Sequence, residues 1–205
     1  MDESSENIAT MLATLSERDG VSPADGALIK TIATESDTLT VPGIGLEEEA
    51  SIDPSQGKGQ VPHEEDPKVT DLRTQMRDMS IPQKVKLALL GNSVARMLLI
   101  SDPNRMIQEA VLKNPRLGPT EVEAFAKNTN VSEFVLREIS NQKDWMRAYS
   151  VKSAIVFNPK TPGDVALRLM RFLNTNELRR LAKSKNVSQL VATTARKRLA
   201  EVDKH

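Results

Sequence analysis

The chain has 205 residues and carries 28 basic and 28 acidic side chains, so its formal net charge is zero. It contains no cysteine, which excludes disulfides, thiolate-ligated metals and iron–sulfur clusters. No apolar run approaches the roughly 18 residues of a membrane-spanning helix, and the acidic start lacks the basic region of a secretory signal. We therefore expect a cytoplasmic protein without membrane insertion.

The neutral total results from two segments of opposite charge. Residues 1–66 hold 15 acidic and three basic side chains, six of the nine glycines and no aromatic residue, whereas residues 67–205 hold 25 basic and 13 acidic side chains. A segment of low hydrophobicity and high net charge cannot bury enough apolar surface to offset the entropy lost on ordering. We predict a largely disordered acidic tail over 1–66 and a folded domain over 67–205.

Within the predicted tail, one short amphipathic segment is a candidate docking helix for a partner. Its apolar side chains are spaced to share one helical face, and they are Ile8, Met11, Leu12 and Leu15. Such segments can fold on a partner; chance amphipathicity is the alternative interpretation. A further hypothesis is that the acidic tail folds back onto the basic domain and competes with its ligand, because the two carry opposite charge.

After the tail, apolar residues recur at helical spacing in a series of short segments. The first are expected at residues 69–76 and 80–90, and Gly91 is a natural stop for the second. Pro103 is expected in the first position of the next helix, after Asp102. The later segments are expected to begin at or just after Thr120, Ser132, Asp144, Pro162, Thr175 and Ser188. No alternating strand pattern competes, so we predict an all-α domain.

Asparagines separate these segments. Ten of the eleven asparagines lie after position 90, mostly beside Pro, Ser, Thr or Gly. Asparagine tolerates the left-handed conformation that ends a helix, and it also caps the helix that follows. Helices this short are marginal alone in water, so we expect them to stack on their neighbours, as the helices of repeat proteins do.

Two short motifs recur along the predicted domain. Asn114-Pro115 returns as Asn158-Pro159 after 44 residues, each time behind an apolar helix end. A second pair, Asn-Val-Ser, opens helices at residues 130–132 and 186–188. These pairs indicate degenerate internal repeats; the alternative is that they are generic caps.

At these residues the chain resembles the leucine-rich-repeat-variant and HEAT-like families of bacterial α-helical repeat proteins. The matching pattern is an acidic opener, an apolar helix, Asn-Pro-x-Thr/Leu and a short second helix, as in residues 144–165 and more weakly 102–117. Residues 80–200 also look like a module of deltaproteobacterial proteins. The resemblance implies a short right-handed α-solenoid that binds a protein or sometimes a nucleic acid. A founding variant-repeat protein holds an iron–sulfur cluster, for which this chain lacks the cysteines.

The domain offers little catalytic chemistry. The only histidines are His63 and His205, neither on a predicted helix, which argues against a Ser–His–Asp or His-ligated metal site. The segment Gly57-Lys58-Gly59 lacks the spacing of a phosphate loop. The carboxylates at predicted helix starts suit the helix dipole; they are Asp102, Glu121, Asp144, Asp164 and Glu177. We expect no catalytic residue, metal or cofactor.

Asp144 and Trp145 permit two interpretations. HEAT-like DNA glycosylases use a tryptophan and an aspartate around a damaged base, which would place both side chains in an open cleft. Alternatively, Asp144 caps a helix and Trp145 packs between repeats. All six aromatic residues fall between positions 125 and 172, which favours a central core.

The cationic C-terminal region is the main candidate binding site. Its basic residues are Arg179, Arg180, Lys183, Lys185, Arg196, Lys197 and Arg198, and Glu177 is the carboxylate among them. Such a stripe can bind an acidic protein face or phosphates; it can also be the solvated face of a terminal repeat. Aromatic residues are missing from this stretch, which weakens the case for single-stranded nucleic acid.

We therefore predict a non-enzymatic adaptor or regulator that binds a partner protein with an acidic face. The predicted contact residues are Arg179, Arg180, Lys183, Lys185, Arg196 and Arg198, with Ile8, Met11, Leu12 and Leu15 in the tail. By resemblance, bacterial signalling, motility or cell polarity are plausible settings, for example as a co-regulator of a small GTPase. The alternative is a nucleic-acid-binding repeat protein that uses the basic C-terminal helices.

Overall fold

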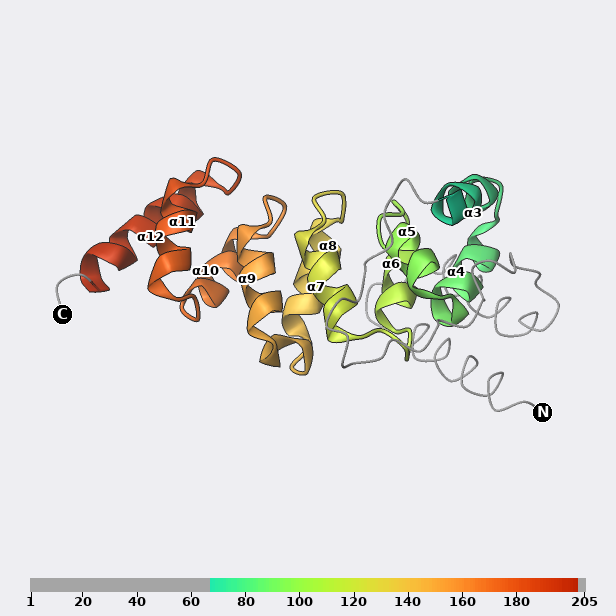
Figure 1. Cartoon of the computed structure of the whole chain (residues 1–205), viewed down its shortest axis with the longest axis horizontal. Coiled ribbons are helices and arrows are strands. Elements are labelled where there is room, and N and C mark those ends of the chain that lie inside the picture. The colour runs from blue at the N-terminus through green and yellow to red at the C-terminus, as the bar shows by residue number, and fades with distance from the viewer. Residues whose placement is uncertain (1–66, 203–205) are drawn as a thin grey trace, which may run out of the picture. The chain divides into compact units, whose positions relative to one another are not determined.

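The computed structural model describes residues 67–202, and all regular structure in this range is helical (Figure 1). Ten α-helices and one 3-10 turn follow one another there without a strand, so the all-α prediction is confirmed for the described residues. None of these helices is both long and apolar enough to cross a membrane. The predicted tail, with Ile8, Met11, Leu12 and Leu15, lies outside the described residues.

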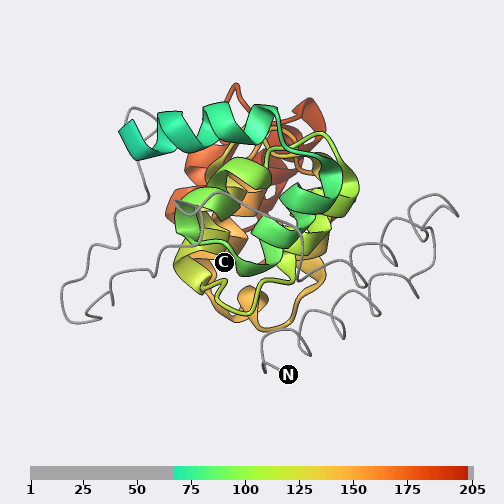
Figure 2. The same ribbon diagram turned by 90° about the vertical axis from the view of Figure 1, so that its right-hand side faces the viewer.

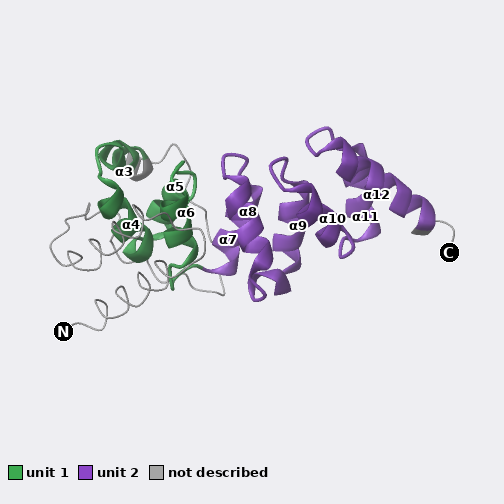
Figure 3. Cartoon of the chain, turned by 180° about the vertical axis from the view of Figure 1, so that it is seen from behind, with its two compact units in different colours: residues 1–117 green, residues 118–205 purple. Residues whose placement is uncertain are grey.

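The chain divides into two compact units, residues 1–117 and 118–205 (Figure 3). In the first, α4 packs on α6, and α5 contacts both, while α3 contacts α5 and runs across the other helices (Figure 2). Its helices are α3 (Pro67–Arg77), α4 (Ile81–Leu90), α5 (Ser93–Leu99) and α6 (Arg105–Leu112). Its fully or nearly fully buried side chains include Leu72, Val85, Leu87, Leu99, Ile107 and Val111.

The second unit holds three successive helix pairs, α7–α8, α9–α10 and α11–α12 (Figure 3). Helices two apart in the chain also touch: α7 packs on α9, and α10 on α12. The helices are α7 (Pro119–Lys127), α8 (Glu133–Asn141), α9 (Tyr149–Phe157), α10 (Gly163–Met170), α11 (Thr175–Lys183) and α12 (Gln189–Val202), with the 3-10 turn η3 (Trp145–Arg147) before α9. Apolar side chains at helical spacing form its core, among them Val122, Phe125, Val135, Ile139, Val151, Ile155, Leu169, Leu181 and Ala195.

The two Asn-Pro motifs make the same hydrogen bonds, one in each unit. Asn158, just after α9, donates through Nδ2 to the carbonyls of Ala126 (2.7 Å) and Asn128 (3.0 Å) at the end of α7. Asn114, after α6, donates to the carbonyl of Ala88 (2.8 Å) near the end of α4. Each Oδ1 accepts the backbone N–H two residues on, at 2.9 Å. The motif therefore ties the C-terminus of a helix to the helix two positions later.

These asparagines are buried: Asn114 and Asn158 are only 4 % and 5 % exposed. At the ends of α7 and α9, Asn128 and Asn158 have φ of −71° and −76° with extended ψ. These two residues therefore do not use the left-handed conformation that asparagine tolerates. The side-chain amide satisfies carbonyls that a left-handed turn would otherwise cap.

Three predicted helix starts are confirmed by side-chain caps. Ser132 and Ser188 accept backbone N–H groups of α8 and α12, and α11 begins at Thr175 with Asn174 as its cap. Asn92 and Asn104 cap α5 and α6 in the same way, at starts that were not predicted. Each of these caps binds a backbone N–H group within three residues, so the sequence alone can reveal it.

Other predicted starts are wrong. Pro103 does not open α6, because Asp102 accepts the N–H of Asn104, which then caps the helix itself. Thr120 lies inside α7, since Pro119 occupies its first position. The separate helix α5 was not predicted; Asn92 begins it directly after the stop at Gly91.

We predict that Asn158→Ala lowers the free energy of unfolding by about 1–3 kcal/mol, because buried carbonyls lose their donor. Asn158→Asp should cost more, since it also directs a negative charge at those carbonyls. Urea denaturation followed by circular dichroism measures both.

The matched control is Asn130→Ala, because Asn130 is exposed. Its effect should stay within about 0.5 kcal/mol. An equal loss at Asn130 and Asn158 would contradict the role assigned to the buried amide.

Candidate functional site: a groove along α9

A hollow of about 870 Å³ runs over the exposed sides of α7, α9 and α11 within the second unit. We call it the α9 groove, because α9 lies in its middle and supplies Tyr149, Ser153 and Phe157, four residues apart. Residues four apart share one face of a helix. The flanking helices contribute Glu123 and Lys127 from α7, and Glu177 and Arg180 from α11, with Lys185 following α11.

The N-terminal half of α9 is joined to α11 by a hydrogen-bonded cluster. The hydroxyls of Tyr149 and Ser153 donate to the carboxylate of Glu177, the latter at 2.6 Å. The Tyr149 oxygen also accepts the N–H of Asn174 at 3.0 Å. The ring of Tyr149 thus remains 42 % exposed while its hydroxyl is held by two partners.

This cluster changes the acidity of the phenol. Partial loss of solvent and then the adjacent Glu177 carboxylate raise the pKa of Tyr149, because both oppose formation of the phenolate. On the other side of the groove, hydrogen bonds from Lys127 and Ser150 lower the pKa of Glu123. Both carboxylates of the groove are thus engaged by donors inside the unit.

Two cations lie near the last turn of α9. The guanidinium of Arg180 is 5.4 Å from the centre of the Phe157 ring, a cation–π contact. Lys185 is exposed at the same side of the groove. Among residues 70–201, neither Arg180 nor Lys185 forms an ion pair with a carboxylate, so their charges are available to a ligand.

The structure separates the basic residues that the sequence grouped together. Arg180 and Lys185 line the groove, whereas Arg179 and Lys183 are exposed outside it. Two others bind helix ends: Arg196 donates to the carbonyl of Ala182 at 3.1 Å, and Arg198 donates to that of Arg171 at 3.2 Å. These last two contacts satisfy carbonyls at the ends of α11 and α10.

The expectation of a central aromatic core is wrong. Of the six aromatic residues only Phe125 is buried, and Tyr149 and Phe172 are 42 % and 45 % exposed. The Phe172 ring lies 4.9 Å from both Lys152 and Arg171. Aromatic rings next to cations are therefore present on this unit, but they come from α9 and the α10–α11 connection.

Asp144 does not cap a helix, and the turn that holds Trp145 contacts both α8 and α9. Asp144 and Trp145 do not begin a long helix: Trp145 opens the 3-10 turn η3, and extended backbone at Ala148 separates that turn from α9. The Asp144 side chain is 87 % exposed and makes no capping hydrogen bond, while Trp145 is half-buried. Neither lines the α9 groove or the second hollow described next.

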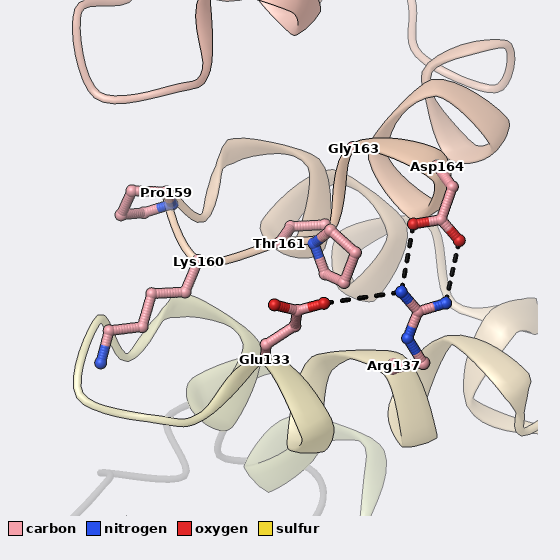
Figure 4. A pocket seen from close by; sticks show the side chains of 8 residues that line it. Glu133, Arg137, Pro159, Lys160, Thr161, Gly163 and Asp164 are labelled. Atoms are coloured by element: carbon pink, nitrogen blue, oxygen red, sulfur yellow. Dashed lines mark hydrogen bonds and ion pairs between the residues drawn. The ribbon is translucent and has the colours of Figure 1, made fainter.

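The second hollow, of about 600 Å³, lies beside the Asn-Pro loop between α9 and α10 (Figure 4). Here Arg137 donates two hydrogen bonds to Asp164, at 2.9 and 3.2 Å, and lies 3.5 Å from Glu133. This pairing lowers the pKa of Asp164 and raises that of Arg137. Its arginine is committed to two carboxylates, so the α9 groove is the better candidate for binding.

Within the described residues, no cluster of three or more His, Asp or Glu side chains could hold a metal ion. No family model, curated protein or solved structure matches this chain. The resemblance to HEAT-like and leucine-rich-repeat-variant proteins therefore stays a prediction.

We predict that the phenol of Tyr149 titrates above the usual range of tyrosine and that Glu177→Gln lowers its midpoint, because a neighbouring negative charge is removed. Tyr149 is the only tyrosine, so an alkaline ultraviolet absorbance titration reports it alone. Part of the elevation should persist in the variant, since partial burial also contributes. Glu133→Gln, in the second hollow, serves as the control; an unchanged midpoint in Glu177→Gln would contradict the contact.

Proposed function

We propose that this protein is a non-enzymatic adaptor or regulator that binds a partner protein through the α9 groove. We further propose that its helices form a short right-handed α-solenoid of the HEAT-like kind. The shared hydrogen bonds of Asn114 and Asn158 support this second proposal, because the same device links helices two apart in both units.

The observation that carries the function is the composition of the groove. Tyrosine and arginine are enriched at the energetically important centres of protein interfaces. Tyr149 is exposed, yet its hydroxyl is already fixed, so a partner would lose little side-chain entropy by packing on its ring. Arg180 and Lys185 add positive charge at one end, where neither is paired with a carboxylate of residues 70–201.

The alternative function, nucleic-acid binding, has one observation in its favour. Residues 118–202 carry 15 basic and eight acidic side chains, and Phe172 lies between two cations. Against it, Glu123 and Glu177 lie within the groove and would repel phosphates. Binding to nucleic acid would also decline steeply with salt.

The test is a quantitative pull-down with the full chain as bait, in lysate with and without nuclease, at low and high salt. Tyr149→Ala combined with Arg180→Ala should reduce recovery of a specific protein at least about tenfold, as expected for interface centres. Arg179→Ala combined with Lys183→Ala is the matched control, because both residues lie on α11 outside the groove.

Recovery that is equal for the groove variant and the control would contradict the proposed binding face. Loss of the captured material on nuclease treatment would favour nucleic acid instead. Circular dichroism of each variant confirms that the helices persist.

A further inference from the structure

We propose that the α9 groove is electrostatically polarised and binds a partner segment in one direction, with acidic residues over Arg180 and Lys185 and donor or basic residues over Glu177. This inference rests on the proposed function and adds the charge pattern of the partner. It follows from how three helices place their charges.

The helices α7, α9 and α11 run in the same direction across the groove. Asn158, which follows the end of α9, reaches the carbonyl of Ala126 at the end of α7. Glu177, in the first turn of α11, binds Tyr149 in the first turn of α9. The N-termini of the three helices therefore lie at one end of the groove and their C-termini at the other. A charged side chain near the N-terminus of α11 thus lies at the N-terminal end of the groove.

The acidic end is formed by Glu177. Its carboxylate accepts hydrogen bonds from two neutral hydroxyls, Tyr149 and Ser153, and no cation among residues 70–201 pairs with it. On the α7 side, Glu123 is paired with Lys127, so that pair adds no net charge. Among residues 70–201 this end thus has one carboxylate without a cationic partner, and the positive N-terminal ends of α9 and α11 offset part of its charge.

The basic end is formed by Arg180 and Lys185. Arg180 lies over the ring of Phe157, the last residue of α9, and Lys185 lines the groove two residues beyond the end of α11. Their charges are attracted to the negative end of a helix dipole, which offsets roughly half a charge per helix and leaves a net positive end. Within residues 70–201 neither cation pairs with a carboxylate, and both lie toward the C-terminal ends of α9 and α11.

The length of α9 sets the spacing that a partner must match. The Glu177 carboxylate binds Tyr149 and Ser153, which lie eight and four residues before Phe157, so it is about 6–12 Å along α9 from the ring under Arg180. An extended peptide covers that distance with about two to four residues. The partner segment should therefore carry its acidic and its basic or donor groups about two to four residues apart, with apolar side chains between them on Tyr149 and Phe157.

Opposite charges at the two ends favour a peptide over two other occupants. A nucleic-acid strand carries negative charge along its whole length and would meet Glu177. The acidic segment 1–66 of the chain itself has 15 acidic and three basic side chains and fits only the basic end well. A segment with separated charges fits both ends.

The experiment compares two fluorescein-labelled peptides of about 12 residues and equal composition, with zero net charge. The blocked peptide has its Glu residues in one half, its Lys residues in the other and Leu between; the alternating peptide has them mixed. The full chain should bind the blocked peptide roughly tenfold more tightly in anisotropy titrations, because only that peptide matches both ends.

Charge reversal identifies the groove as the origin of this preference. Arg180→Glu combined with Lys185→Glu should abolish the difference between the peptides, whereas Arg179→Glu combined with Lys183→Glu should preserve it. All four of these side chains are exposed, and circular dichroism verifies that each variant folds.

Equal affinity of the wild-type chain for both peptides would overturn the polarity. A difference in affinity between the peptides that persists in Arg180→Glu with Lys185→Glu would also overturn it. So would an oligothymidylate that binds the wild-type chain more tightly than the blocked peptide and loses this binding in that variant. A third contrary result is displacement of the blocked peptide by synthetic segment 1–66 at a concentration lower than that of the blocked peptide itself. If the peptides are not distinguished but the pull-down still depends on Tyr149 and Arg180, the proposed function stands and only the polarity fails.

Discussion

The buried amide of Asn158 is the interaction on which the α9 groove depends. Helices of eight or nine residues are marginal alone in water, and the carbonyls at their ends need donors. The Nδ2 group of Asn158 supplies those donors to α7 from the end of α9, so one side chain both completes a helix and fixes its neighbour. Asn114 does the same for α4 from the end of α6. In the second unit this alignment brings Tyr149, Phe157 and the α11 charges to one surface.

The sequence predicted those parts of the fold that depend on local chemistry. Helix caps such as Asn174 and Ser132 act within three residues, and their side chains are where the pattern places them. The helices expected from Ser132 and Thr175 are present as α8 and α11, and their apolar side chains such as Ile139 and Leu181 are buried. The helix predicted from Asp144 was wrong because nothing in the apolar spacing reveals the extended residue at Ala148, where η3 ends and α9 begins.

The groove could not be predicted in the same way. Tyr149 and Phe157 were assigned to the core with the other aromatic residues, because all six fall between positions 125 and 172. Whether they are buried depends on which helix covers them, and that is set by contacts more than 20 residues away, such as those of Tyr149 with Asn174 and Glu177. Likewise, Arg196 and Arg198 look equivalent to Arg180 in the sequence, yet they bind carbonyls of other helices. A polar and aromatic stripe at positions 149, 153 and 157 was the available signal for the site.

We infer that the helices tied by buried asparagines fold as one unit and so hold the groove in place. Native-state hydrogen exchange at increasing denaturant, resolved for single amides, tests this most directly. We expect the slowly exchanging amides of α7 and α9 to become exposed in one common opening, with the same free energy and the same dependence on denaturant. Independent opening of α7 while α9 stays protected would contradict it.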